Sequence, residues 1–273
     1  MPPELVRIER SGDGGSVALV VFDDPGRRNA MTESMGRALT QVVARLSSDP
    51  DLRAVVLTGA GNAFSAGGDL AMLEAKSRAG REAPGTAGRE ASRTFMRDFY
   101  RLFLSVRDLP CPSIAALNGA AIGAGLAIAL ACDLRVAARD AKLGLNFTQL
   151  GIHPGMGASW TLPRLVGPAH AADLLLTGRT IDGAEAARIG LVNRCVERAD
   201  VVATALEMAH AIARCAPIAV RGTRAALHRS MAATLDSQLE FEAEQQAICY
   251  ESADFAEGLR AVREKRPPRF EGR

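Results

Sequence analysis

The stretch "NGAAIGAGLAIALACD", Asn118 to Asp133, is rich in glycine at its start and then apolar, with no charged side chain before its last residue. It follows the apolar run "SIAAL" and predicts a buried strand, a bare turn and the start of a short helix. The first N–H groups of a helix have no partner within the helix, and glycine and alanine let a ligand oxygen approach them closely. The stretch therefore indicates a site that works through its main chain.

An earlier stretch, "VVLTGAGNAFSAGGDL" (Val55 to Leu70), has the same plan of strand, glycine-rich turn and helix start. Two such turns facing one another would offer two converging N–H donors, which is an oxyanion hole for a carbonyl oxygen. The alternative, that both turns are tight packing corners, stays open at this point. A nicotinamide site is not favoured, because the sixth position of the G-x-G-x-x-G pattern is Phe64.

Strands and helices alternate through the first two thirds of the chain, which indicates an α/β fold. Ser16 to Asp24 and Arg53 to Gly59 are β-branched runs, and between them Thr32 to Asp49 has helical spacing with Thr32 as a cap. Further on, "DLRVAA" and "LVNRCV" predict strands, and "HAADLLLTG" and "DGAEAARIG" predict helices.

The C-terminal part predicts a helical layer, from Val196 to about Arg263. Its expected inner face is Met208, Ile212, Leu227 and Leu235. We expect a core domain at residues 1–196 and a helical oligomerisation domain at residues 197–273. Lys76 to Thr94, which has few large apolar residues, predicts a mobile surface loop, with a substrate-covering segment as the alternative.

Composition narrows the class of protein. The chain has 273 residues with 33 Lys and Arg against 31 Asp and Glu, so no basic excess suggests nucleic-acid binding. Five scattered cysteines without a C-x-x-C pair favour reduced thiols and a cytoplasmic location. No histidines pair at ligand spacing, and no metal is expected.

The sequence predicts neither a secretory signal nor a transmembrane span. The start "MPPELVRIER" has no apolar segment of a secretory signal. Leu109 to Cys132 is uncharged and long enough to span a bilayer, but prolines and glycines interrupt it, so we expect buried core and no membrane partner.

Taken together, "AFSAGGDL" and "NGAAIGAGLAIALACD" resemble the crotonase superfamily, the enoyl-CoA hydratase/isomerase family. "RRNAM", "LGIHPGMGASWTLPRLVG", "LLLTGRTIDGAEAARIGLVNRCV" and "VREKRPPRF" extend the resemblance over nearly the whole chain. It implies a core of repeated ββα turns, a C-terminal helical trimerisation domain, and assembly as a homotrimer or dimer of trimers. It also implies an acyl-CoA substrate, with coenzyme A as part of the substrate and no other cofactor.

The resemblance also assigns residues. The N–H groups of Gly68 and Ala124 would polarise the thioester carbonyl, although most relatives have glycine at the second position. Positions that flank the acyl-CoA, or match family residues near it, are Arg28, Ala30, Ala66, Asp69, Leu70, Gly123, Lys265 and Phe270. The last two often come from a neighbouring subunit in the family. Plain solvated charge is the alternative for Arg28 and Lys265.

The family's two catalytic glutamates fall on Ala127 and Phe147, which cannot transfer a proton. Such a step is typically worth 10²–10⁴-fold, so the reaction needs another group. His153 is the candidate, with a hydrogen bond to the backbone beside Pro154 as the alternative. We expect Asp69 to cap a helix and Asp133 to be structural; Thr148 and Gln149 can only orient water.

Large aromatic side chains offer a further choice. Phe147 and Trp160 can line an acyl pocket or belong to the core, and core is favoured for Trp160.

Three functions follow from this pattern. The favoured one is a hydratase/isomerase-type enzyme that stabilises an enolate with Gly68 and Ala124. The second is an acyl-CoA binder without catalysis. The third is another acyl-CoA reaction on the same scaffold, which the absence of a carboxylate in "GIHPG" disfavours.

Overall fold

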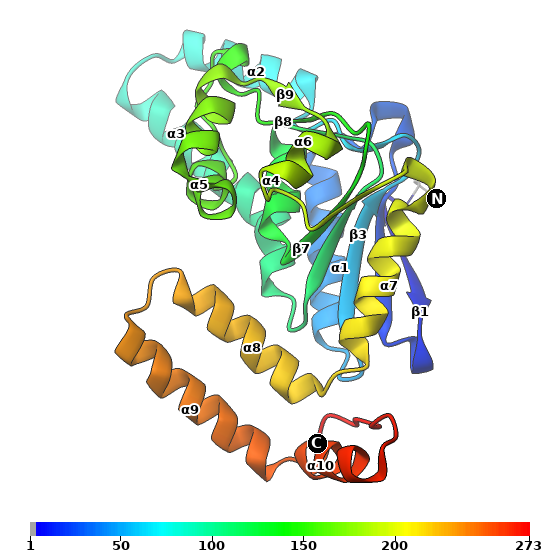
Figure 1. The fold of residues 1–273 in the computed structure, drawn as a ribbon. Helices are drawn as coiled ribbons and strands as arrows, with labels where there is room; N and C mark the ends of the chain where they lie inside the picture. Colours follow the sequence, from blue (N-terminus) through cyan, green and yellow to red (C-terminus); the bar gives the residue numbers. More distant parts are fainter. Residues whose placement is uncertain (1–3) are drawn as a thin grey trace.

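The computed structural model describes residues 4–273, which form a core of two sheets with helices around it and a helical extension (Figure 1). The larger sheet has the order β1-β2-β3-β5-β7-β10, and all neighbours are parallel except β1 and β2. Its strands are β1 (Val6–Ser11), β2 (Val17–Phe22), β3 (Ala54–Gly59), β5 (Ser113–Leu117), β7 (Leu134–Ala138) and β10 (Arg194–Val196). Every residue of β3 and β5 is buried, as their continuous apolar runs predict.

The smaller sheet has the order β4-β6-β8-β9. Its strands are β4 (Ala63–Ser65), β6 (Ala120–Ile122), β8 (Leu143–Gly144) and β9 (Thr180–Ile181). Chain order shows that β3, β5 and β7 each continue, after a short turn, into a strand of this second sheet. A helix then follows β4 and β6, so the ββα plan repeats.

Helices cover both sheets. They are α1 (Glu33–Ser47), α2 (Leu70–Glu82), α3 (Thr86–Leu104), α4 (Ala124–Ala131), α5 (Ala158–Thr177), α6 (Gly183–Arg188) and α7 (Val201–Ala213). Thr32 caps α1 as expected, accepting a hydrogen bond from the N–H of Met35 at 3.1 Å. All eight residues of α4 are buried, so the uncharged stretch from Leu109 to Cys132 is strand, turn and short helix within the core.

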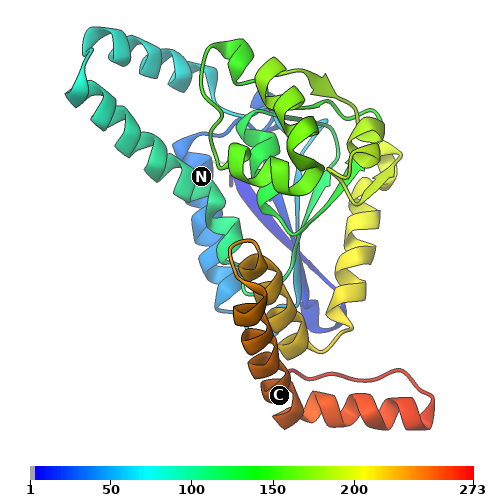
Figure 2. The same cartoon turned by 60° about the vertical axis from the view of Figure 1, so that its left-hand side comes forward.

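The last three helices, α8 (Pro217–Ser230), α9 (Leu235–Glu251) and α10 (Ala253–Glu264), extend away from the core (Figures 1 and 2). Met208 and Ile212 of α7 pack against the core as predicted. The prediction for Leu227 and Leu235 was wrong, because these side chains are 63% and 74% exposed. In one chain, α8 is bonded to the core on one side through Arg224 and His228, while α9 has no buried residue. The boundary at residue 196 stays a prediction.

The prediction of a loop at Lys76 to Thr94 was also wrong. The segment is helical in α2 and α3, with only a short break between them. Its Ala, Arg and Glu residues are strong helix formers even without burial. The ammonium of Lys76 lies 3.2 Å from the ring centroid of Phe95 and joins the two helices.

Among residues 4–273, no single helix is long and apolar enough to span a membrane. The pair Arg198–Ala213 and Pro217–Ser230, bent by 112°, meets the length and composition requirement only when its two helices are counted together.

Candidate active site

The two glycine-rich turns lie at the same edge of the smaller sheet. β4 and β6 are parallel neighbours, with Ala63 opposite Ala120 and Ser65 opposite Ala121. Because the carboxyl ends of parallel neighbours meet at one edge, the turn after β4 lies beside the turn after β6. Helices α2 and α4 therefore begin next to each other.

Direct contact between the turns leaves no room for a side chain at Gly67. A Cβ on this residue would lie 2.3 Å from the carbonyl oxygen of Ile122 and 3.5 Å from the amide nitrogen of Ala124. The backbone of Gly67 also has φ of +87°, a conformation that favours glycine. Both requirements explain why this turn has glycine here.

The amides of Gly68 and Ala124 both point out of their turns. A trans peptide is planar, so an N–H points opposite to the preceding carbonyl. The carbonyl of Gly67 accepts a hydrogen bond from Met31 at 2.8 Å, so the Gly68 N–H faces away from Met31. The carbonyl of Gly123 accepts from Ala127 at 3.1 Å inside α4, so the Ala124 N–H faces out of the helix start. Within residues 4–273, neither N–H has a hydrogen-bond acceptor.

The "RRNAM" segment lies along the first turn. The N–H of Ala66 donates to the carbonyl of Arg28 at 2.9 Å, so these two predicted residues are neighbours. Both are exposed, whereas Ala30 is buried behind them. Leu70, in the first turn of α2, is 70% exposed. The structure thus places four of the predicted flanking residues in the first turn or in the segment bonded to it.

Two apolar side chains occupy the positions that the resemblance assigns to glutamates. Ala127 is buried in α4, one turn after Ala124. The ring of Phe147 is buried and lies 3.9 Å from the point where a Cβ on Gly123 would stand. Phe147 therefore belongs to the hydrophobic core and borders the second turn, so both interpretations given for it remain open.

His153 is exposed in the loop before α5. Its Nδ1 lies 2.8 Å from the carbonyl oxygen of Pro154, so the backbone contact expected as the alternative is present. A carbonyl only accepts, so Nδ1 is the donor in this contact.

Comparison with known proteins identifies the family. The enoyl-CoA hydratase/isomerase family model matches residues 12–273. The chain belongs to this family. A Thermus thermophilus relative is 40% identical over 266 residues, covering 97% of this chain and 100% of the relative. The short-chain-enoyl-CoA hydratase of Clostridium acetobutylicum is 38% identical over 254 residues, covering 92% and 93%.

The same family is found among solved structures. The crystal structure of enoyl-CoA hydratase from Bacillus anthracis is 32% identical and has a TM-score of 0.87, covering 98% of this chain and 100% of that one. The predicted fold class, an α/β crotonase core with a helical C-terminal region, is confirmed. The chain is thus an enzyme of the hydratase/isomerase type.

Other predicted residues of this enoyl-CoA hydratase/isomerase family member have structural roles. Asp69 caps α2 by accepting from the N–H of Met72 at 3.0 Å. Asp133 is bonded to Ser113, Arg224 and His228, and is structural as expected. The hydroxyl of Thr148 and the amide of Gln149 donate to backbone carbonyls at the end of α5.

Trp160 differs from the prediction of a core residue. Its side chain is 41% exposed on α5, and the guanidinium of Arg164 lies 4.2 Å from its ring centroid. A guanidinium stacked on the ring covers part of it without a core.

Two cysteines, Cys111 and Cys132, have buried thiols. Burial raises the pKa of each thiol to about 12, so both stay protonated at neutral pH.

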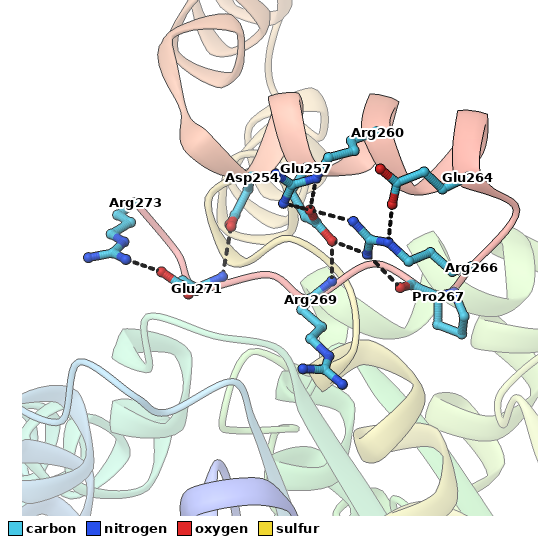
Figure 3. A network of polar contacts seen from close by, with 9 residues as sticks. All are labelled: Asp254, Glu257, Arg260, Glu264, Arg266, Pro267, Arg269, Glu271 and Arg273. Carbon is cyan, nitrogen blue, oxygen red and sulfur yellow. Dashed lines mark hydrogen bonds and ion pairs between the residues drawn. The ribbon is translucent and has the colours of Figure 1, made fainter.

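Lys265 and Phe270 do not reach the glycine turns of their own chain. They follow α10, which lies at the opposite end of the molecule from α2 (Figures 1 and 2). Figure 3 shows how acidic side chains of α10 hold the tail after it. Asp254 accepts from the N–H groups of Glu271 and Gly272 at 2.7 and 2.9 Å, and Glu257 accepts from that of Arg269 at 2.9 Å. The C-terminal segment is therefore fixed, with Phe270 packed against α10 at Gly258.

Sequence reasoning missed two buried polar residues beside the first turn, Asn29 and Ser65, each 1% exposed. Both stand inside the motifs quoted for the resemblance. A buried polar residue next to a glycine turn is a signal that it holds backbone groups in place.

Proposed function

We propose that this enzyme acts on an enoyl- or acyl-CoA thioester and holds the thioester oxygen between the N–H groups of Gly68 and Ala124. The observation that carries the proposal is the contact between the two turns, which leaves both amides without an acceptor at the start of neighbouring helices. Preorganised donors of this kind stabilise charge that develops in the transition state, and each is worth ~3 kcal/mol.

The proposed reaction is the addition of water across the double bond of an enoyl thioester. The water oxygen bonds to C3, and the electron pair of the double bond moves toward the thioester oxygen, giving an enolate. The N–H groups of Gly68 and Ala124 stabilise that negative charge. A proton then reaches C2, and the carbonyl is restored. Migration of the double bond would begin with loss of a C2 proton from a 3-enoyl thioester. The resulting dienolate would be stabilised by the same two N–H groups, and a proton added at C4 would give the 2-enoyl thioester.

Proton transfer in this proposal does not involve the two glutamates of the family. Ala127 and Phe147 stand in their places and carry no acid or base. We assign the transfer to His153, whose contact with the carbonyl of Pro154 leaves Nε2 as the proton acceptor. Nε2 would take the proton from the attacking water and return it to C2.

The coenzyme A part of the substrate would lie along the exposed side of the first turn. Arg28, Ala66 and Leu70 are exposed there, and Arg28 offers a positive charge. Lys265 and Phe270 would contact it from a neighbouring subunit, since they lie far from the turns of their own chain (Figure 1). The proposal therefore requires an oligomer.

Exposed apolar side chains support assembly as a homotrimer or dimer of trimers. Helix α9 has no buried residue in the single chain. Apolar side chains of α8, the loop after it, α9 and α10 are between 39% and 77% exposed: Leu227, Met231, Leu235, Leu239, Ile248, Tyr250, Phe255, Leu259 and Val262. Exposed apolar side chains in this number favour a protein partner, and a second copy of the same helices is the simplest one.

No cofactor enters the proposed chemistry, because coenzyme A arrives with the substrate. The five cysteines are free, which fits the reducing cytoplasm that we propose as the location.

A panel of enoyl-CoA substrates tests the proposal. The purified protein is incubated with crotonyl-CoA and longer 2- and 3-enoyl-CoAs, and hydration and double-bond migration are followed by mass and absorbance. We expect turnover of at least one member. Acyl-CoA binding by calorimetry without turnover of any member would contradict the proposed reaction and indicate a binder or another acyl-CoA reaction.

His153 is tested with a second exposed histidine as the matched control. His153→Ala is expected to lower kcat by roughly 10²–10⁴-fold while coenzyme A still binds. His170→Ala, which removes an exposed histidine of α5, should keep full activity. Full activity of His153→Ala would show that His153 does not transfer the proton. It would not contradict the proposed role of the Gly68 and Ala124 amides.

A further inference from the structure

Ser65, the last residue of β4, joins three parts of the candidate site through one buried side chain. Its hydroxyl donates to the carbonyl of Asn29 at 2.8 Å and accepts from the N–H of Gly67 at 3.2 Å. A Cβ on Gly125, in the first turn of α4, would lie 2.9 Å from the same oxygen. Ser65 thus contacts the "RRNAM" segment, the first turn and the helix that follows the second turn.

Asn29 holds the other side of this arrangement. Its backbone has φ of +55°, which is unusual for a residue with a side chain. Its side-chain amide donates to the carbonyls of Ala60 and Ala63 at 3.0 and 2.9 Å, and its Oδ1 accepts from the N–H of Asp24 at 2.9 Å. The hydroxyl of Ser65 completes the set by bonding the Asn29 carbonyl. These bonds keep a strained segment in one conformation.

The direction of the Gly68 amide depends on these hydrogen bonds of Ser65 and of the segment around Asn29. The N–H of Gly67 turns inward to Ser65, and the carbonyl of Gly67 bonds Met31, two residues after Asn29. These two bonds fix both peptides that flank Gly67, and the second of them carries the N–H of Gly68. The backbone carbonyl oxygen and the Cβ of Ser65 limit how closely α4, and therefore Ala124, approaches the first turn, because a Cβ on Gly125 would lie 2.5 and 2.8 Å from them.

We propose that Ser65 is a positioning residue of the active site, whose hydroxyl fixes the direction of the Gly68 amide relative to the amide of Ala124. This inference rests on the proposed function of those amides. Ser65 itself is 1% exposed and does not meet the substrate. Without the hydroxyl, the buried N–H of Gly67 has no acceptor and turns to find another, and the Gly68 amide turns with it.

The test compares Ser65→Ala with Thr58→Val. Thr58 of β3 is also buried, and its hydroxyl donates to the carbonyl of Ala116 in β5 at 3.0 Å, so Thr58→Val removes a similar buried hydrogen bond between two strands of the larger sheet. We expect Ser65→Ala to lower kcat on the order of 10²-fold with KM within about twofold, because small misplacements of catalytic groups have effects of this size. Thr58→Val should keep kcat. Ser65→Cys, which keeps a weak donor and acceptor in the same place, should recover part of the loss.

A second measurement does not need turnover. The infrared carbonyl band of bound acyl-CoA, labelled with ¹³C at the thioester, reports how strongly the amides polarise it. We expect a lower frequency in the wild type and Thr58→Val than in Ser65→Ala. Equal frequencies and equal kcat in Ser65→Ala and the wild type would overturn the role of Ser65. A wild-type band at its solution frequency would instead overturn the proposed function of the two amides, and this inference with it.

Discussion

Gly67 packs directly against the carbonyl of Ile122, so that any Cβ on Gly67 would come within 2.3 Å of that oxygen. Backbone rather than a flexible side chain occupies the space, and it belongs to the turn that carries Ala124. The relationship makes the spacing of the two turns sensitive to a single methyl group.

Gly67→Ala should therefore separate the turns. We expect kcat/KM to fall by at least about 10²-fold, since one donor of an oxyanion hole is worth that much, together with a loss of stability from the positive φ. Gly80→Ala is the matched control. A Cβ on Gly80, in the exposed part of α2, meets nothing within 4 Å, so this variant should keep activity and gain up to ~1 kcal/mol of stability. Wild-type kinetics in a folded Gly67→Ala would contradict the predicted spacing.

Asp133 ties α8 to the core, and its removal should destabilise the fold. Its carboxylate accepts from the N–H and hydroxyl of Ser113 and from Arg224, at 2.8 to 2.9 Å, and lies 2.7 Å from Nε2 of His228. We expect Asp133→Asn to lower the free energy of unfolding at pH 7 by about 3 kcal/mol, because it leaves the buried guanidinium of Arg224 without its partner charge. Glu33→Gln, which removes an exposed pair with Arg37, should change it by less than about 1 kcal/mol.

The effect of Asp133 should depend on pH. Burial raises the pKa of Asp133, but the charge and hydrogen bond of Arg224, with those of Ser113 and His228, outweigh it and hold the pKa below its ordinary value. A carboxylate with a lowered pKa contributes its stability above the unfolded value, about 3.9, and loses it as the pH falls through the folded value. Urea unfolding should show the gap between wild type and Asp133→Asn shrinking below about pH 4. A constant gap would contradict the account.

The oligomer should depend on the exposed face of the C-terminal helices. Val262 of α10 is 77% exposed in the single chain. We expect Val262→Asp to shift the protein from trimer or hexamer toward monomer in sedimentation, because a carboxylate in an apolar interface has no partner. Leu176→Asp, at an equally exposed leucine of α5, should keep the trimer. A wild-type monomer would remove the shared coenzyme A site at Lys265 and Phe270.

The strands and the two turns could be predicted from the sequence because their signals are local. Continuous apolar runs followed by glycine mark β3 and β5 without knowledge of the rest of the chain. The contact between Gly67 and Ile122 could not be predicted in this way, since it depends on the register of β4 against β6. The resemblance supplied the pairing of the turns, and the structure supplied their direct contact.

The wrong predictions all concern segments or side chains that are exposed to solvent in the single chain. The prediction of a loop at Lys76 to Thr94 fails because the end of α2 and the first half of α3, rich in Arg and Ala, lack the apolar stripe that identifies a helix. Leu227, Leu235 and Trp160 were assigned to interior positions because their side chains are large and apolar. In the single chain these residues are exposed, and burial by a second copy cannot be seen from one sequence.

Exchange of the C2 protons of butyryl-CoA in D₂O tests most directly whether Gly68 and Ala124 stabilise an enolate. A saturated thioester cannot be hydrated, so deuterium at C2 reports enolate formation alone, and mass spectrometry detects it. We predict incorporation with the wild type and with Gly80→Ala, and a large loss of incorporation with Gly67→Ala. Butyryl-CoA that binds to the wild type and gains no deuterium would contradict the central claim.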